Sequence, residues 1–203
     1  MARRTKEEAQ ATRTALLDAA ERLFQQHGVA GTTLNDIAQE AGLTRGAVYW
    51  HFTDKADLFN AMLERVALPK EELAPPPTAC TAPALPKLRQ RVAELMARIE
   101  ADAQLQRVME IMLLKSEYVD AMAASRERRL QMRTDFREGL EAFLRAAQKH
   151  GEVRRDVPVA VQAIGLHALL DGLLQDWLLE RRHDLRSRGM KLVDVYLAGL
   201  ASR

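Results

Sequence analysis

The chain has little of what marks secreted, membrane-spanning or metal-binding proteins. It contains one cysteine, Cys80, which excludes an internal disulfide and fits a reducing compartment such as the cytoplasm. It has no run of about 18 apolar residues, so we expect no membrane span. The basic N-terminus is followed by charged amphipathic sequence rather than the apolar stretch of a signal peptide. The histidines lack metal-ligand spacing, so we expect neither a metal ion nor a cofactor.

The sequence also lacks any pattern expected of a catalytic site. The four serines, Ser116, Ser125, Ser187 and Ser202, lie in no nucleophile motif, and Cys80 has no histidine near it in sequence. We therefore expect that this protein is not an enzyme.

What the chain does contain is helix-forming sequence. Only 10 glycines and 7 prolines occur in 203 residues, and apolar residues recur at helical rather than strand spacing. This pattern predicts an all-α fold of about nine helices, over residues 6–27, 34–41, 45–51, from 54 onwards, 87–101, 103–115, 119–149, 158–181 and 185–201. Six of the prolines lie within residues 69–86, which predicts a loop there and a boundary between residues 1–65 and 66–203.

Residues 37–52 have the pattern of a helix-turn-helix. Ala38 is small where two helices would cross, and Gly42 tolerates the positive φ of a tight turn. Ile37, Leu43 and Val48 are apolar at positions that would hold the helix pair on the preceding helix. An ordinary helical hairpin is the alternative, and the spacing favours a helix that binds in the major groove of double-stranded DNA.

The polar residues in and around this segment are suited to DNA. Arg45, near the start of the second helix, can contact guanine with two hydrogen bonds, and Gly46 allows the backbone close to DNA. The predicted contacts from the motif are Thr33, Thr44, Arg45, Gly46, Tyr49, Trp50, His51 and Lys55. The alternative role for Trp50 is packing in the core, and we expect that role for Phe52. The alternative for Lys55 is that of an ordinary solvated lysine.

Charge alone is weak evidence for nucleic acid. The chain carries a net charge of +2, and residues 1–65 have eight cations against nine acids. Two local features remain: residues 41–53 contain no acid, and Arg3, Arg4 and Lys6 form a basic N-terminal arm. The arm could contact phosphates or the minor groove, or be a disordered tail. A helical adaptor that binds no nucleic acid is the remaining alternative class.

Several segments together resemble a known family. The first 65 residues resemble the N-terminal domain of the TetR family of transcriptional repressors. Within them, residues 3–10 and 44–52 are most similar to its AcrR- and TtgR-type multidrug-efflux repressors. Weaker similarity continues at residues 109–111, 115–118, 171–173 and 177–178. The resemblance implies a homodimer that binds an inverted-repeat operator and releases it when a hydrophobic drug-like molecule binds. Control of a metabolic or catabolic operon by another effector is the alternative.

The resemblance also divides the chain into a DNA-binding domain, residues 1–65, and a ligand-binding and dimerisation domain, residues 66–203. In the family the last two helices form the dimer interface. Residues 158–181 are apolar on almost every side, and Gly165 and Gly172 would permit close approach. Burial within one subunit is the alternative.

A ligand pocket inside the second domain is likewise implied by the family. Glu110 and Asp171 are favoured contacts, because a buried carboxylate needs an arginine or a cationic ligand, whereas His167 is expected to be a core histidine. Many of the apolar candidates would be ordinary core. We expect ligand to shift the helix at 103–115 against that at 54–68. The candidates are Val66, Val92, Met96, Arg107, Glu110, Leu113, Leu114, Phe136, Leu140, His167, Leu170, Asp171 and Leu174.

Overall fold

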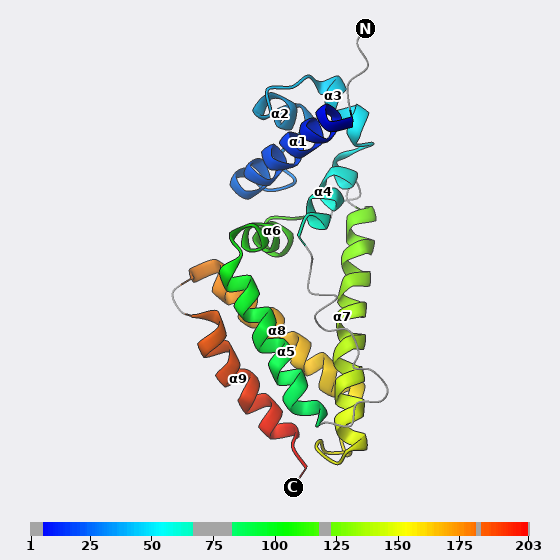
Figure 1. The fold of residues 1–203 in the computed structure, drawn as a ribbon, viewed down its shortest axis with the longest axis vertical. Coiled ribbons are helices and arrows are strands. Elements are labelled where there is room, and N and C mark those ends of the chain that lie inside the picture. Colours follow the sequence, from blue (N-terminus) through cyan, green and yellow to red (C-terminus); the bar gives the residue numbers. More distant parts are fainter. Residues whose placement is uncertain (1–5, 67–82, 118–122, 182–183, 203) are drawn as a thin grey trace. The chain divides into compact units, whose positions relative to one another are not determined.

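The computed structural model describes residues 6–66, 83–117, 123–181 and 184–202, and within these ranges the fold is all-α (Figure 1). The nine described helices are α1 (Lys6–His27), α2 (Leu34–Glu40), α3 (Arg45–His51), α4 (Lys55–Glu64), α5 (Ala84–Ala101), α6 (Ala103–Leu114), α7 (Ala123–Lys149), α8 (Val159–Glu180) and α9 (Leu185–Leu200). The predicted fold class is confirmed. None of these helices is long and apolar enough to cross a membrane.

The chain forms two compact units, and α6 and α7 each contain residues of both. The first unit comprises residues 1–66 and 107–129, and the second comprises 67–106 and 130–203. The division predicted from sequence, 1–65 and 66–203, stays a prediction about function.

The predicted proline-rich loop is wrong for its last three residues. Helix α5 begins at Ala84, so Pro86 lies in its first turn, where a missing N–H costs no helical hydrogen bond. The side chain of Glu152 accepts hydrogen bonds from the backbone nitrogens of Ala84 and Leu85, at 2.8 and 2.9 Å. That cap comes from a distant part of the chain, which local sequence does not indicate. Residues 69–82, with Cys80, lie outside the described residues.

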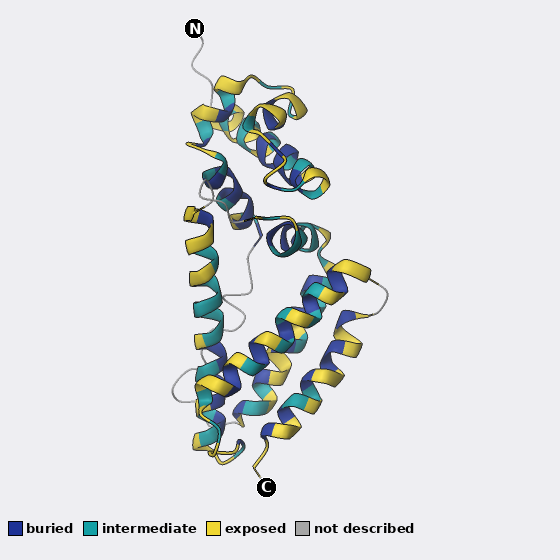
Figure 2. Cartoon of the chain, turned by 180° about the vertical axis from the view of Figure 1, so that it is seen from behind, coloured by how far each residue is buried: buried dark blue, intermediate teal, exposed yellow. Residues whose placement is uncertain are grey.

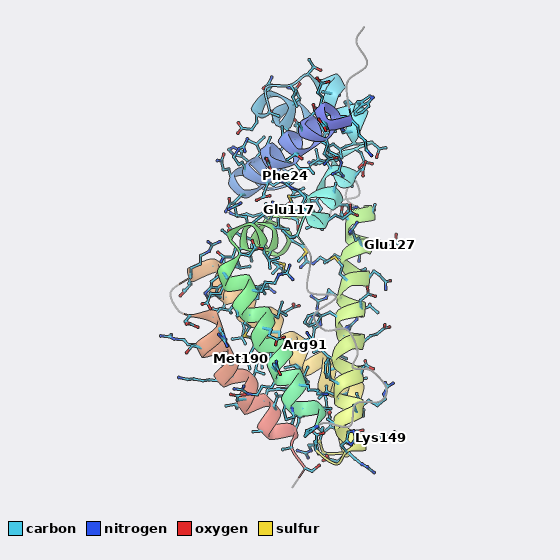
Figure 3. The ribbon with its side chains drawn as sticks, viewed as in Figure 1. Phe24, Arg91, Glu117, Glu127, Lys149 and Met190 are labelled. Atoms are coloured by element: carbon cyan, nitrogen blue, oxygen red, sulfur yellow. The ribbon has the colours of Figure 1, made fainter. Side chains whose placement is uncertain are left out.

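The core of the first unit forms where α1 packs against α2, α3 and α4. Phe24 of α1, labelled in Figure 3, is fully buried, and its ring lies 6.0 Å from that of Phe59 on α4. Ile37 of α2 and Val48 of α3 are also fully buried. These apolar contacts hold the two short helices, which would be unstable alone, on the longer α1.

The later helices extend the first unit. The hydroxyl of Ser125 on α7 donates to the carbonyl of Ala56 on α4, at 3.4 Å, and Arg128 pairs with Glu64 at 2.7 Å. Arg129 donates to the carbonyl of Met112 on α6, at 2.9 Å. The unit that contains the helix-turn-helix therefore includes the second half of α6 and the start of α7.

In the second unit, α9 packs on both α5 and α8. Arg89 of α5 makes two hydrogen bonds to Asp194 of α9, at 2.6 and 2.8 Å. A Cβ added at Gly189 would lie 2.9 Å from the sulfur of Met96, so the glycine allows α5 and α9 to approach closely. Buried and exposed residues alternate along α9, as an amphipathic helix requires (Figure 2).

Candidate DNA interface

Helix α2 begins with a reciprocal cap. The hydroxyl oxygen of Thr33 accepts from the backbone nitrogen of Asp36 at 3.2 Å, and the carboxylate of Asp36 accepts from the Thr33 backbone nitrogen at 2.8 Å and from its hydroxyl at 2.7 Å. These reciprocal hydrogen bonds form a capping box. The hydrogen bonds from the Thr33 side chain and backbone hold the pKa of Asp36 below its usual value. Thr33 thus has a structural role, and its phosphate contact stays a prediction.

A tight glycine turn separates α2 from α3. Gly42 has φ of +67°, in the left-handed region that glycine tolerates best. The backbone nitrogen of Leu43 donates to the carbonyl of Ala38 at 2.8 Å, which closes the end of α2. Thr44 then caps α3, because its hydroxyl oxygen accepts from the backbone nitrogen of Ala47 at 3.3 Å. The turn predicted at Gly42 is confirmed.

The exposed part of α3 carries three of the predicted DNA-contacting residues. Arg45, Tyr49 and Trp50 are exposed, the last by 67%, whereas Val48 points into the core. The guanidinium of Arg45 donates to the Tyr49 hydroxyl at 3.2 Å and lies 5.4 Å from the centre of its ring. That hydrogen bond raises the pKa of Arg45. The structure thus holds an arginine and two aromatic side chains on a seven-residue helix.

Gly46 is exposed on the same helix, and no contact with the described residues requires a glycine there. An added Cβ would have Thr44 Oγ1 at 3.8 Å as its nearest neighbour, which is ordinary contact. Glycine inside a helix is about 1 kcal/mol less favourable than alanine. The fold therefore gains nothing from Gly46, which supports the prediction that close approach to DNA explains it.

His51 and Phe52 differ in exposure from the residues before them. Phe52 is 2% exposed, with the Arg13 guanidinium 5.2 Å from its ring centre, so it belongs to the core as expected. The rings of Trp50 and His51 meet edge to face at 4.5 Å. His51 is partly exposed. This contact orients Trp50 while leaving most of its surface accessible.

Lys55 has partners inside the unit. Its ammonium donates to the backbone carbonyls of Val29 at 2.7 Å and Thr32 at 3.0 Å, and burial lowers its pKa. The sequence predicts either a contact with DNA or an ordinary solvated lysine. The structure adds a third role, in which Lys55 fixes the loop between α1 and α2.

The basic arm is only partly described. Lys6 is the first residue of α1 and is exposed, whereas Arg3 and Arg4 lie outside the described residues. A residue that sequence reasoning missed is Asn35, which lines an open groove of about 370 Å³ together with Arg45, Tyr49 and Lys55. Its position two residues after the Thr33 cap is the signal that could have indicated it.

The second unit contains one group of predicted ligand contacts that lie close together. Asp171 pairs with Arg133 at 2.6 Å, and its other oxygen lies 3.5 Å from Nε2 of His167. The ring of Phe136 is 5.2 Å from the ring of His167. Burial is the main cause that lowers the pKa of His167. The carboxylate of Asp171 raises this pKa, and the positive charges of Arg133 and Arg137 lower it further. Of the two partners expected for this carboxylate, the chain itself supplies the arginine.

The other ligand candidates fall in both units. In the second unit Val92, Leu140, Leu170 and Leu174 are buried, and Met96 is buried against Gly189 of α9. The candidates in the first unit are Val66, Arg107, Glu110, Leu113 and Leu114. Arg107 and Glu110 are both bonded to side chains of α1. The role of these positions in ligand binding stays a prediction.

Helices α8 and α9 expose an unusual amount of apolar surface. Large apolar side chains on α8 and α9 are about half exposed or more: Val161, Ile164, Leu179, Leu192 and Val195. Gly165, by contrast, serves contact within the chain, because an added Cβ would lie 2.4 Å from the Tyr196 hydroxyl. Gly172 is exposed, and a Cβ added there would have open space around it, with none of the described side chains within 4 Å.

The capped helix pair and its exposed basic and aromatic face define a helix-turn-helix protein. Residues 16–62 match the bacterial regulatory proteins of the tetR family, and residues 83–201 match the C-terminal region of MAATS-type transcriptional repressors. The chain therefore belongs to the TetR family of transcriptional regulators, as its sequence predicts.

Individual relatives agree with this assignment. The transcriptional regulator TtgR of Pseudomonas putida is 38% identical over 187 residues, which cover 88% of this chain and 86% of TtgR. NalD, the secondary repressor of the MexAB-OprM multidrug efflux pump in Pseudomonas aeruginosa, has a TM-score of 0.86 and 34% identity over 95% of this chain and 98% of its own. The SmeT–triclosan complex has a TM-score of 0.81 and 36% identity over 95% and 92% of the two chains. SmeT is the repressor of the Stenotrophomonas maltophilia multidrug efflux pump SmeDEF.

Proposed function

We propose that this protein is a drug-responsive repressor that binds an inverted-repeat operator as a homodimer and controls a multidrug efflux operon. It acts by binding alone, without catalysis, and in the cytoplasm, where its DNA is. The observation that carries the proposal is the exposed face of α3, where Arg45, Tyr49 and Trp50 stand on a helix fixed by the Thr44 cap and the buried Val48. A short helix fixed in this way fits the major groove.

The efflux target rests on the relatives. NalD and SmeT are each described as the repressor of a multidrug efflux pump, and both match almost the whole chain at above 30% identity. Similarity that extends through the second unit supports a similar kind of effector as well as a similar way of binding DNA.

The effector is proposed to be apolar and neutral or weakly acidic. Asp171 is already paired with Arg133, and His167 is uncharged at neutral pH because burial lowers its pKa. A cationic ligand would have to displace the Arg133 guanidinium from the carboxylate, which costs more than binding an uncharged molecule. Phe136 and the buried leucines Leu140, Leu170 and Leu174 would supply apolar contact.

The dimer is proposed to form through the exposed apolar face of α8 and α9. Single exposed apolar residues are common, but five large ones on two adjacent packed helices favour an interface. A paired subunit would cover them and fix the spacing of two α3 helices on one operator.

The DNA-binding proposal is tested with the intergenic DNA next to the protein's own gene. A gel shift should show specific binding that is relieved by triclosan, the compound bound by SmeT. Arg45→Ala should weaken specific binding by about 1–3 kcal/mol and relax specificity at one base position. Arg22→Ala is the matched control, because Arg22 is an exposed arginine of α1 paired with Glu40. Equal effects of the two substitutions would count against the proposed role of α3.

The dimer is tested by sedimentation equilibrium. Val195→Asp places a charge at a residue that is 71% exposed in the single chain and should produce monomers. Leu130→Asp on α7, where the side chain is 51% exposed, is the control and should leave the association state unchanged. A Val195→Asp protein that still sediments as a dimer would exclude this face.

A further inference from the structure

Glu21 of α1 is a buried carboxylate that meets two arginines from other helices. It is 4% exposed. Its Oε1 accepts from Nε of Arg107 on α6 at 2.8 Å, and its Oε2 lies 3.8 Å from Nη1 of Arg65, which follows α4. Arg65 also pairs with Asp18 at 2.5 Å. Three helices of the first unit therefore meet at one charge that folding has removed from water.

The contact with Arg107 is the first of three that join α1 and the loop after it to α6 and the residue after it. Four residues further along α1, Nε2 of Gln25 donates to Oε2 of Glu110 at 3.2 Å. After another four residues, the backbone nitrogen of Val29 donates to the carbonyl of Lys115 at 3.0 Å. We refer to these three pairs, Glu21–Arg107, Gln25–Glu110 and Val29–Lys115, as the α1–α6 ladder.

The ladder ends at the loop that leads into the helix-turn-helix. Gly28 has φ of +75°, and an added Cβ would lie 3.4 Å from the Lys115 carbonyl oxygen, so the backbones approach closely there. The Val29 carbonyl accepts from Lys55, which also holds the Thr32 carbonyl next to the α2 cap. A movement of α6 that shifts the α1–α6 ladder would therefore also displace the residues at the start of α2.

We infer that Glu21 and Arg107 are positioning residues that fix the second half of α6 to the DNA-binding helices. A change in the position of α6 is then transmitted through α1 to α3. The inference rests on the proposed function. It gives Arg107 and Glu110 a role in positioning rather than in ligand contact. It also adds α1 to α4 as an element that responds to α6, since α4 meets the ladder through Lys55 at its start and through Arg65 just after its end.

The charges at Glu21 suit a contact that opens and closes. The Arg107 side chain is 41% exposed, so water can solvate its guanidinium when the pair opens. Glu21 would keep Arg65 as a neighbour and would not be left as an isolated buried charge. A switch needs two states that differ by only a few kcal/mol, and a carboxylate shared by two arginines reduces the cost of opening.

The test uses the full chain, a DNA duplex selected by the wild-type protein from random sequence, and hydrogen exchange. In the wild type, DNA binding should slow amide exchange across residues 107–114 and at Val29 by about fivefold or more. Arg107→Met removes the guanidinium and keeps the apolar stem. It should still bind the duplex and show slower exchange in α2 and α3, but the effect on residues 107–114 should be lost. Arg107→Lys keeps a cation and should recover part of it.

Arg128→Met is the matched control, because it breaks the exposed pair with Glu64 in the same unit and should behave as the wild type. The inference is overturned if DNA binding still slows amide exchange in residues 107–114 of Arg107→Met as much as in the wild type. It is also overturned if Arg107→Met loses DNA affinity while this slowing is retained, because that result indicates a pair with a purely structural role. If Arg107→Met does not fold, Arg107→Lys decides by the same criteria. A wild type that selects no duplex would instead refute the proposed function.

Discussion

Replacing Lys55 by methionine distinguishes its two proposed roles, phosphate contact and internal support. The ammonium donates to the carbonyls of Val29 and Thr32, at 2.7 and 3.0 Å, and methionine keeps the apolar stem while removing both hydrogen bonds. A hydrogen bond from a charged group contributes about 1.5–3 kcal/mol to stability. Both bonds share one partly exposed ammonium and water can replace them in part, so we expect a total loss of about 2 kcal/mol.

The loss should appear as a lower melting temperature. In a chain of this size, about 1 kcal/mol corresponds to a shift of roughly 2–4 °C, so Lys55→Met should melt roughly 4–8 °C lower. Urea unfolding followed by circular dichroism gives the free energy directly. The dependence of DNA affinity on salt should keep its slope, because the lysine is committed to the protein.

Lys6→Met is the control, since Lys6 is exposed at the start of α1. If the basic arm contacts phosphate, this variant should keep the melting temperature and reduce the salt slope by about 1. The reasoning about Lys55 is refuted if Lys55→Met melts as the wild type does and loses salt dependence instead.

Four further substitutions test particular features. Gly46→Ala should leave the free energy of unfolding unchanged or raise it by up to about 1 kcal/mol, yet weaken operator binding in a fluorescence titration; unchanged affinity would contradict close approach to DNA. Gly165→Ala should cost about 1–3 kcal/mol in urea unfolding, because its Cβ would meet the Tyr196 hydroxyl at 2.4 Å, whereas Gly172→Ala, with open space around it, should cost nothing. Because burial lowers the pKa of His167 below its ordinary value of 6.5, the unfolded chain binds the proton more readily than the folded chain. Stability should therefore fall as pH drops below about 6.5, and less steeply in His167→Gln. Parallel pH curves for the two proteins would refute this.

Local sequence accounts for most of the helix-turn-helix. Thr33 and Thr44 cap because a hydroxyl before a helix finds backbone nitrogens two or three residues away, and Gly42 turns because it tolerates positive φ. The exposure of Arg45 and Tyr49 follows from the helical period once Val48 is buried. All of these features depend on residues within about one helical turn of one another.

Sequence by itself thus determined the fold class, the helix-turn-helix and the face that it presents, since each depends on spacing along one short segment. The tertiary structure decided which partner each distant charge meets. Arg107 and Glu21 are 86 positions apart, Asp171 and Arg133 are 38 apart, and Lys55 and Val29 are 26 apart. The spacing of residues along one helix does not specify such pairs. They form only when helices pack together and bring a charged side chain next to a group that can replace its hydrogen bonds to water.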